Sequence, residues 1–312
     1  MKRRVIKLGT ATLVASLPSK WIKEFGIKQG DYLDVEERKG DLVLSTEKRI
    51  TKNEKILDFT NVNTVIALIF LQAAYNAGFE KIVINHNPQI DEYKTGKKIK
   101  TTEFLQKITK LFIGIEIIEQ NENKTVLKDI GEVSDKESDD IISRALWLTK
   151  WTGDECLEAV KSNKKEALEE IRIRWENIVR FLNYYRRILA KKGYKDFDKT
   201  PIMLEITSYI REIADVYKFI AIETIELKKK YSPKTLETFE KINKSLEKFC
   251  SIFFKFSSEK AMEIVKERES IWHEMNKEKK KCLKEDAFLY GRLAVIVVVL
   301  LKALEDRFAI EI

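Results

Sequence analysis

The chain has 312 residues, of which 44% are hydrophobic and 35% are charged, and its formal net charge at pH 7 is +8. Its length suggests two or three domains with sizeable cores, and only 11 Gly and 4 Pro indicate long helices joined by short loops. Because 58 basic residues face 50 acidic ones, the excess charge indicates a polyanionic partner only where basic residues cluster. The three cysteines are too far apart for a zinc motif or a disulfide framework, which indicates a reduced, cytoplasmic protein.

Residues 4–46 predict a compact basic module built from short strands and one helix. Every charged residue from Lys2 to Lys23 is positive. Gly9 and Gly30 can adopt the positive φ that tight turns require. Alternating apolar residues predict strands, and a polar-capped segment predicts a helix. In chain order these elements are strands at 4–8 and 11–17, a helix at 19–25, and strands at 32–36 and 42–45.

This order of elements resembles the SpoVT/AbrB family of swapped-hairpin DNA-binding domains. The residues that carry the resemblance are Gly9, Leu17, Pro18, Gly26, Gly30, Asp31, Leu33 and Val35. It implies an intertwined homodimer through residues 1–49, in which hairpins from two chains interleave and a basic face contacts double-stranded DNA. The alternative is a small β-module that only dimerises. The residues expected to contact DNA are Arg3, Arg4, Lys7, Thr10, Lys20 and Lys23.

Residues 50–133 predict a small α/β domain. The apolar run at 62–77 predicts a helix that is buried on most sides. The glycines of this region form no phosphate-binding loop pattern, so no nucleotide site is indicated. The other expected elements are a strand at 81–85, a polar loop at 87–102, a helix at 102–112, and strands at 113–117 and 126–130.

From residue 134 onward, apolar residues recur every three or four positions and predict six long helices. They divide into two three-helix units, 134–231 and 232–312, because Asp215 and Asp306 occupy similar places in the third helix of each unit. The most apolar stretch, 287–301, is shorter than the roughly 20 residues that span a bilayer. We therefore expect it to be a core helix, with no membrane insertion.

A second resemblance rests on residues 209–215 (YIREIAD) and 300–306 (LLKALED). They resemble the repeated helix signature of the PhoU family of phosphate-uptake regulators, and with the N-terminal domain the chain resembles an archaeal form of that family. Family members bind metal ions through the carboxylate pairs of this signature, in which a carboxylate lies four residues before each Asp. Here Arg211 and Lys302 occupy those positions, so i, i+4 ion pairs with exposed Asp215 and with Asp306 are expected. We therefore predict no bound metal and no other cofactor.

No pattern of catalytic residues is present, so we expect no enzyme. His86 and His273 are expected to be surface or partly packed residues, and no nucleophile motif accompanies them.

The predicted fold is multi-domain, with an N-terminal swapped-hairpin β domain, a small α/β domain and C-terminal all-α tandem three-helix bundles of the PhoU kind. The two resemblances imply a cytoplasmic DNA-binding regulator of phosphate uptake, whose helical part has a phosphate transporter or a signalling protein as its partner. Two alternatives stay open. One is an AbrB-type transcription factor that responds to a different signal, and the other is a helical adaptor of a phosphate transporter that does not bind DNA.

Overall fold

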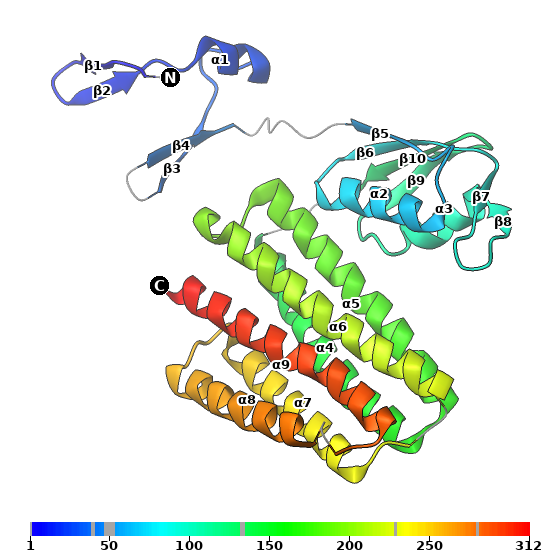
Figure 1. The fold of residues 1–312 in the computed structure, drawn as a ribbon. Coiled ribbons are helices and arrows are strands. Elements are labelled where there is room, and N and C mark those ends of the chain that lie inside the picture. The colour runs from blue at the N-terminus through cyan, green and yellow to red at the C-terminus, as the bar shows by residue number, and fades with distance from the viewer. Residues whose placement is uncertain (1, 39–40, 47–53, 132–134, 228–229, 279–280) are drawn as a thin grey trace. The chain divides into compact units, whose positions relative to one another are not determined.

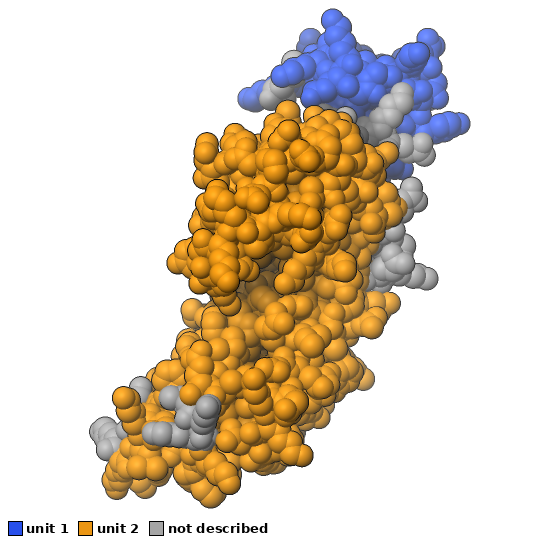
Figure 2. Space-filling model, turned by 90° about the vertical axis from the view of Figure 1, so that its right-hand side faces the viewer, with its two compact units in different colours: residues 1–53 blue, residues 54–312 orange. Residues whose placement is uncertain are grey.

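The computed structural model describes residues 2–38, 41–46, 54–131, 135–227, 230–278 and 281–312 (Figure 1). The chain forms two compact units, which Figure 2 shows in different colours. We call residues 1–53 the head and residues 54–312 the body. The finer division of the chain after residues 49, 133 and 231 stays a prediction.

The head consists of two separate antiparallel hairpins and one short helix. Gly9 takes a φ of 73° in the turn of the first hairpin, and Gly26 ends the helix in the left-handed conformation, as turn and C-cap geometry require. The predicted strand–helix–strand order is confirmed. The elements are β1 (Val5–Leu8), β2 (Thr12–Ala15), α1 (Ser19–Phe25), β3 (Asp34–Arg38) and β4 (Asp41–Ser45).

Within one chain, the described residues of the head form almost no core. The apolar side chains of its strands are exposed: Leu13 is 68% exposed and Val35 is 61% exposed. No residue of α1 is buried, and Thr46 is the single buried residue among those described in the head. The two hairpins also belong to separate sheets. The apolar strand residues of the head therefore gain little burial in a single chain.

The body begins with a four-stranded sheet in the order β5-β6-β10-β9. β5 runs parallel to β6, and the other two pairs are antiparallel. Both α2 and α3 pack on one face of this sheet in a shared hydrophobic core. The elements are β5 (Glu54–Asp58), α2 (Thr64–Asn76), β6 (Lys81–Asn85), β7 (Gln89–Asp91), β8 (Lys98–Lys100), α3 (Thr101–Thr109), β9 (Ile115–Gln120) and β10 (Lys124–Asp129).

Three features of this domain differ from the prediction. β5 is additional, because its charged first residues, Glu54 and Lys55, leave too short an apolar alternation to indicate a strand. The expected polar loop at 87–102 contains the β7–β8 hairpin, which the buried side chain of Ile90 attaches to the core. The helix α2 is not buried on most sides, because the sheet covers only one side of it and the opposite apolar residues are exposed.

The rest of the body consists of long helices, and all six predicted helices are present. α4, α5 and α6 pack together, as do α7, α8 and α9, while α6 against α9 and α4 against α7 join the two groups. One continuous hydrophobic core runs through all of them. Their bounds are α4 (Asp135–Ser162), α5 (Lys165–Lys192), α6 (Thr200–Leu227), α7 (Pro233–Phe253), α8 (Ser258–Glu278) and α9 (Lys284–Glu311).

Among the described residues, α9 is the one helix that is long and apolar enough to cross a membrane by length and composition. Half of its most apolar stretch is buried inside the protein. Leu293, Ile296 and Leu300 belong to the bundle core, and the Nε of Arg292 donates to Glu223 of α6 at 3.1 Å. The expected core helix at 287–301 is confirmed.

Candidate functional site

The residues expected to contact DNA are all exposed on the head. They fall into two groups, one at the first hairpin and one on the short helix. Arg3 and Arg4 precede β1, Lys7 lies in β1, Thr10 lies in the turn between β1 and β2, and Lys20 and Lys23 lie on α1.

β1 carries apolar residues on both of its faces. Because side chains alternate along a strand, Val5 and Lys7 share one face, and Leu13 of β2 lies opposite Lys7 on that face. Ile6 and Leu8 project from the other face. All four apolar side chains are more than half exposed in the single chain. The hairpin therefore exposes apolar side chains on both faces, with Lys7 among them on the face of Val5 and Leu13.

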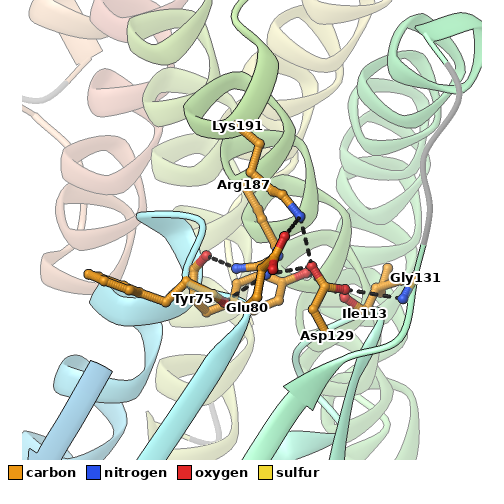
Figure 3. Close-up of polar contacts among 8 residues, drawn as sticks. Tyr75, Glu80, Ile113, Asp129, Gly131, Arg187 and Lys191 are labelled. Carbon is orange, nitrogen blue, oxygen red and sulfur yellow. Dashed lines mark hydrogen bonds and ion pairs between the residues drawn. The ribbon is translucent and has the colours of Figure 1, made fainter. Parts of the chain in front are cut away.

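One buried guanidinium joins the α/β domain of the body to its helices (Figure 3). Arg187 of α5 donates hydrogen bonds to the carbonyl oxygens of Tyr75 at 2.6 Å and Phe79 at 2.8 Å, beside the C-terminal end of α2. It also donates to the Asp129 carboxylate at 2.6 Å, and its guanidinium carbon lies 4.8 Å from the centre of the Tyr75 ring. The side chains of Arg187 and Asp129 are 3% and 10% exposed. We call the group formed by Arg187, Tyr75, Phe79, Asp129 and Lys191 the Arg187 anchor.

The Asp129 carboxylate has partners besides Arg187. The ammonium of Lys191 lies 3.0 Å from it, and the backbone N–H of Gly131 donates to it at 3.1 Å (Figure 3). Burial by itself raises the pKa of Asp129, but the hydrogen bonds and positive charge of Arg187 and Lys191 outweigh burial and hold it below its ordinary value. The carboxylate therefore stays ionised at neutral pH. Sequence reasoning missed this cluster, because Arg187 is one of several basic residues on its helix.

A cleft of about 680 Å³ lies near the anchor, between the α/β domain and α5. Ile113, whose carbonyl accepts a hydrogen bond from the Tyr75 hydroxyl at 2.7 Å, is one of its lining residues. Lys110 and Arg180 also line it, with Glu116 as a negative charge. The Nε atom of Arg180 is buried and has no hydrogen-bond partner in the described structure. The volume suits a small ligand, and two basic side chains against one acidic one give the lining an excess of positive charge.

At Asp215 the predicted ion pair with Arg211 is confirmed, at 3.3 Å. The expected exposure of Asp215 is wrong, because two further side chains surround its carboxylate. The indole N–H of Trp175 donates to it at 2.5 Å, and the ammonium of Lys218 lies 3.2 Å away. Both cations also lie over the Trp175 ring, 5.0 Å and 3.8 Å from its centre. Asp215 is thus the acceptor of a cluster that connects α5 with α6.

The second predicted ion pair, between Lys302 and Asp306, is wrong. Lys302 is exposed, whereas Asp306 is half-buried, and its Oδ2 atom is buried without a hydrogen-bond partner in the described structure. Burial and the negative charges of Glu205 and Glu305 raise the pKa of Asp306. Among the residues that the structure describes, no group of three His, Cys, Asp or Glu side chains is placed to hold a metal ion.

His86 is buried, contrary to the expected surface or partly packed position. Its side chain is 2% exposed, and its Nδ1–H donates to the Asn87 carbonyl oxygen at 3.0 Å. Its Nε2 lies 3.0 Å from the hydroxyl of Thr125. Both ring nitrogens therefore have partners within the protein, which is typical of a structural histidine. His273 is exposed.

Removing the buried cation of the Arg187 anchor should destabilise the body strongly. Arg187→Met leaves two carbonyls and a buried carboxylate without their donor, so we expect the free energy of unfolding to fall by about 3–5 kcal/mol. Lys191→Met removes a more exposed partner of the same carboxylate and should cost only about 0–1 kcal/mol. Denaturant unfolding measures both, and equal losses in the two variants would contradict the anchor.

The pH dependence of stability should also change in Arg187→Met. Because the folded-state pKa of Asp129 is lowered, its stabilising contribution is complete above its ordinary pKa and is lost as the pH falls through the lower folded-state value. Arg187→Met should show a smaller acid-dependent loss, because only Lys191 and the Gly131 N–H then lower the pKa of Asp129. A titration of the unfolding free energy from pH 2 to 5 measures the difference.

Asn substitutions at Asp215 and Asp306 should have different effects on stability. Asp215→Asn leaves Arg211 and Lys218 without their anion, and we expect a loss of about 1–2 kcal/mol. Asp306 has a raised pKa, so its ionised form costs stability as the pH rises above its ordinary value. Asp306→Asn removes that cost and should leave the thermal midpoint unchanged or higher at pH 7. A similar decrease of the thermal midpoint in both variants would contradict the different surroundings of the two carboxylates.

Comparison with known proteins bears on the head alone. The family described as antidote-toxin recognition MazE, bacterial antitoxin, matches residues 6–52. A search of curated proteins found no match. Domains of the MazE/AbrB type typically bind DNA and dimerise. The chain therefore carries a MazE/AbrB-like, strand-rich head, which suggests a DNA-binding regulator of the AbrB kind, followed by a helical body.

Proposed function

We propose that the protein is a cytoplasmic, homodimeric transcriptional regulator that binds double-stranded DNA through its head and responds to phosphate uptake through its body. The match of the head to a MazE/AbrB-type domain carries the DNA-binding part of this proposal. The proposed contact residues are the exposed basic and hydroxyl side chains Arg3, Arg4, Lys7, Thr10, Lys20 and Lys23.

The charge of the head supports contact with the DNA backbone. Long, exposed basic side chains can reach phosphate oxygens, and the neutralisation of each phosphate releases counterions from the DNA. Pairing two heads doubles the number of such side chains. It also gives the protein a twofold axis, which matches the symmetry of a palindromic site.

The phosphate part of the proposal has different support. The resemblance of residues 209–215 and 300–306 to the PhoU signature suggests a body that senses phosphate or docks on a phosphate transporter or a signalling protein. The cleft beside the Arg187 anchor, with Lys110 and Arg180 in its lining, has the charge that an oxyanion would need. The alternatives are an AbrB-type factor with another signal, and a transporter adaptor that does not bind DNA.

DNA binding should depend on the basic residues at the first hairpin. Replacing Arg4 and Lys7 together with Ala removes four cations per dimer, so affinity should fall and the slope of log K against log salt should become shallower by about 3–4. The matched control replaces two exposed cations of α5, Lys165 and Arg172, and should leave both quantities unchanged. Fluorescence anisotropy with promoter DNA over a salt series measures them. If the Arg4/Lys7 variant binds as the parent does, the head serves dimerisation only.

The same measurement tests the signal. Inorganic phosphate, added at constant ionic strength, should change the affinity for DNA, whereas sulfate should not. Arg180→Met should abolish the response while leaving the affinity without phosphate unchanged. Equal effects of phosphate and sulfate would favour the regulator that responds to a different signal.

A further inference from the structure

The helix α2 presents an apolar surface that none of the described residues of the body covers. None of its 13 residues is charged. Ala67, Leu71, Ala74 and Tyr75 are buried on the side that faces the sheet. The opposite side is exposed, and we call it the α2 stripe; its members are Val65 (41% exposed), Ile66 (39%), Ile69 (53%), Phe70 (45%) and the exposed Ala73.

These residues form one continuous face. Positions 66, 69, 70 and 73 follow the i, i+3, i+4, i+7 spacing that places side chains along one side of a helix. The helix is also held firmly in place. The side-chain amide of Gln72 donates to Asn183 of α5 at 3.1 Å, and Arg187 binds the carbonyl of Tyr75 near the helix end. The α2 stripe is therefore presented in a fixed orientation, as a binding surface requires.

A contiguous exposed apolar patch of this kind marks an interaction site rather than ordinary surface. Polar or charged residues would serve solubility better at every one of these positions. A helix of 13 residues is about 20 Å long, which is too short to cross the roughly 30 Å core of a bilayer. The stripe thus suits a contact with another protein surface.

We propose that the α2 stripe packs against the α2 stripe of a second copy of this chain. The head is of a type that typically dimerises, so two bodies are tethered together. Residues 47–53, at the end of the head, connect Thr46 to β5, the strand that precedes α2, and a stretch of this length spans at most about 30 Å. A short tether of this kind gives the two bodies a local concentration in the millimolar range.

The composition of the stripe also favours its own copy as the partner. In a twofold dimer the same patch meets itself, so any charge near the axis would face a like charge. The α2 stripe has none. It also combines a large ring, Phe70, with the small side chain of Ala73, which allows two helices to approach closely and interdigitate.

The size of the stripe explains why it would depend on the head. One helix face covers far less than the roughly 800 Å² per partner of a standard interface. It therefore cannot hold two separate chains together, but it can align two bodies that the head already joins. The inference requires only a dimeric head, and it is independent of DNA binding and of phosphate.

Cysteine cross-linking of the 312-residue chain tests this contact. Single variants Ile66→Cys, Ile69→Cys, Phe70→Cys and Ala73→Cys scan the stripe for the position nearest the twofold axis. The matched control is Ile173→Cys on α5, because Ile173 is 55% exposed and Ile69 is 53% exposed. The parent, with Cys156 and Cys250 buried and Cys282 half-buried, gives the baseline.

Under mild oxidation, at least one α2 variant should form a disulfide-linked dimer about tenfold faster than Ile173→Cys, since a disulfide needs the two Cα atoms within about 7 Å. If no α2 position exceeds the control while light scattering still gives a two-chain mass, the inference is overturned and the dimeric head stands. A one-chain mass for the parent would overturn both.

A charged substitution in the α2 stripe tests the contact independently of cross-linking. Ile69→Asp should separate the two bodies and increase the radius of gyration in small-angle X-ray scattering while the two-chain mass is kept. Ile173→Asp should leave the scattering curve unchanged. An unchanged curve for Ile69→Asp would contradict the contact. A second contradictory outcome is that the parent binds phosphatidylcholine vesicles, Ile69→Asp does not, and the α2 cysteine variants form no disulfide-linked dimer. The stripe would then contact a membrane surface.

Discussion

The constraint that governs the head, and with it the assembly of the protein, is that the described residues of the head form almost no core within a single chain. Each apolar side chain that becomes fully buried contributes about 1.5–3 kcal/mol to folding stability. Domains as small as the head bury little surface and are only marginally stable. In the single chain, Leu13, Val35 and Leu42 contribute almost none of this, because all three are more than half exposed. A second chain is the direct way to bury them. We therefore expect the head to fold as a dimer, as domains of the MazE/AbrB type typically do.

In the body, the Arg187 anchor has a corresponding role. A buried ion pair adds little net stability when compared with apolar packing, but it penalises every arrangement that leaves its charges unpaired. Arg187 binds the end of α2 and Asp129 of β10 at the same time, so it fixes the α/β domain on the helices. The cleft and the α2 stripe both lie near the Arg187 anchor. The cleft with Arg180 lies on the α3–β9 side, and the α2 stripe belongs to the helix that Arg187 holds.

Much of the fold could be predicted from local patterns. The three- and four-residue spacing of apolar side chains places all six long helices, because a helix that packs in a bundle must repeat its buried face. Alternation and turn glycines likewise identify the hairpins of the head. Gly153, which interrupts the apolar positions of α4, has a tertiary reason instead. A Cβ atom there would lie 2.6 Å from the Tyr217 ring, so only glycine lets the two helices approach.

The features that escaped prediction depend on residues far apart in the chain. Arg187 and the carbonyl of Tyr75 are 112 positions apart, and no local pattern distinguishes this arginine from its neighbours. The i, i+4 spacing predicts that Asp306 pairs with Lys302, but the surroundings of Asp306 include Glu205 of another helix. The exposed side of α2 also depends on tertiary packing. An uncharged helix is equally compatible with full burial and with a face reserved for a second chain.

The dependence of the head on a second chain is tested most directly by hydrogen exchange measured over a dilution series, with sedimentation reporting the mass. Amides of β1 to β4 should be protected where the protein has a two-chain mass. They should lose protection together as the mass falls to that of one chain, while amides of α4 to α9 stay protected. Protected β1–β4 amides in a species of one-chain mass would contradict the requirement for a second chain.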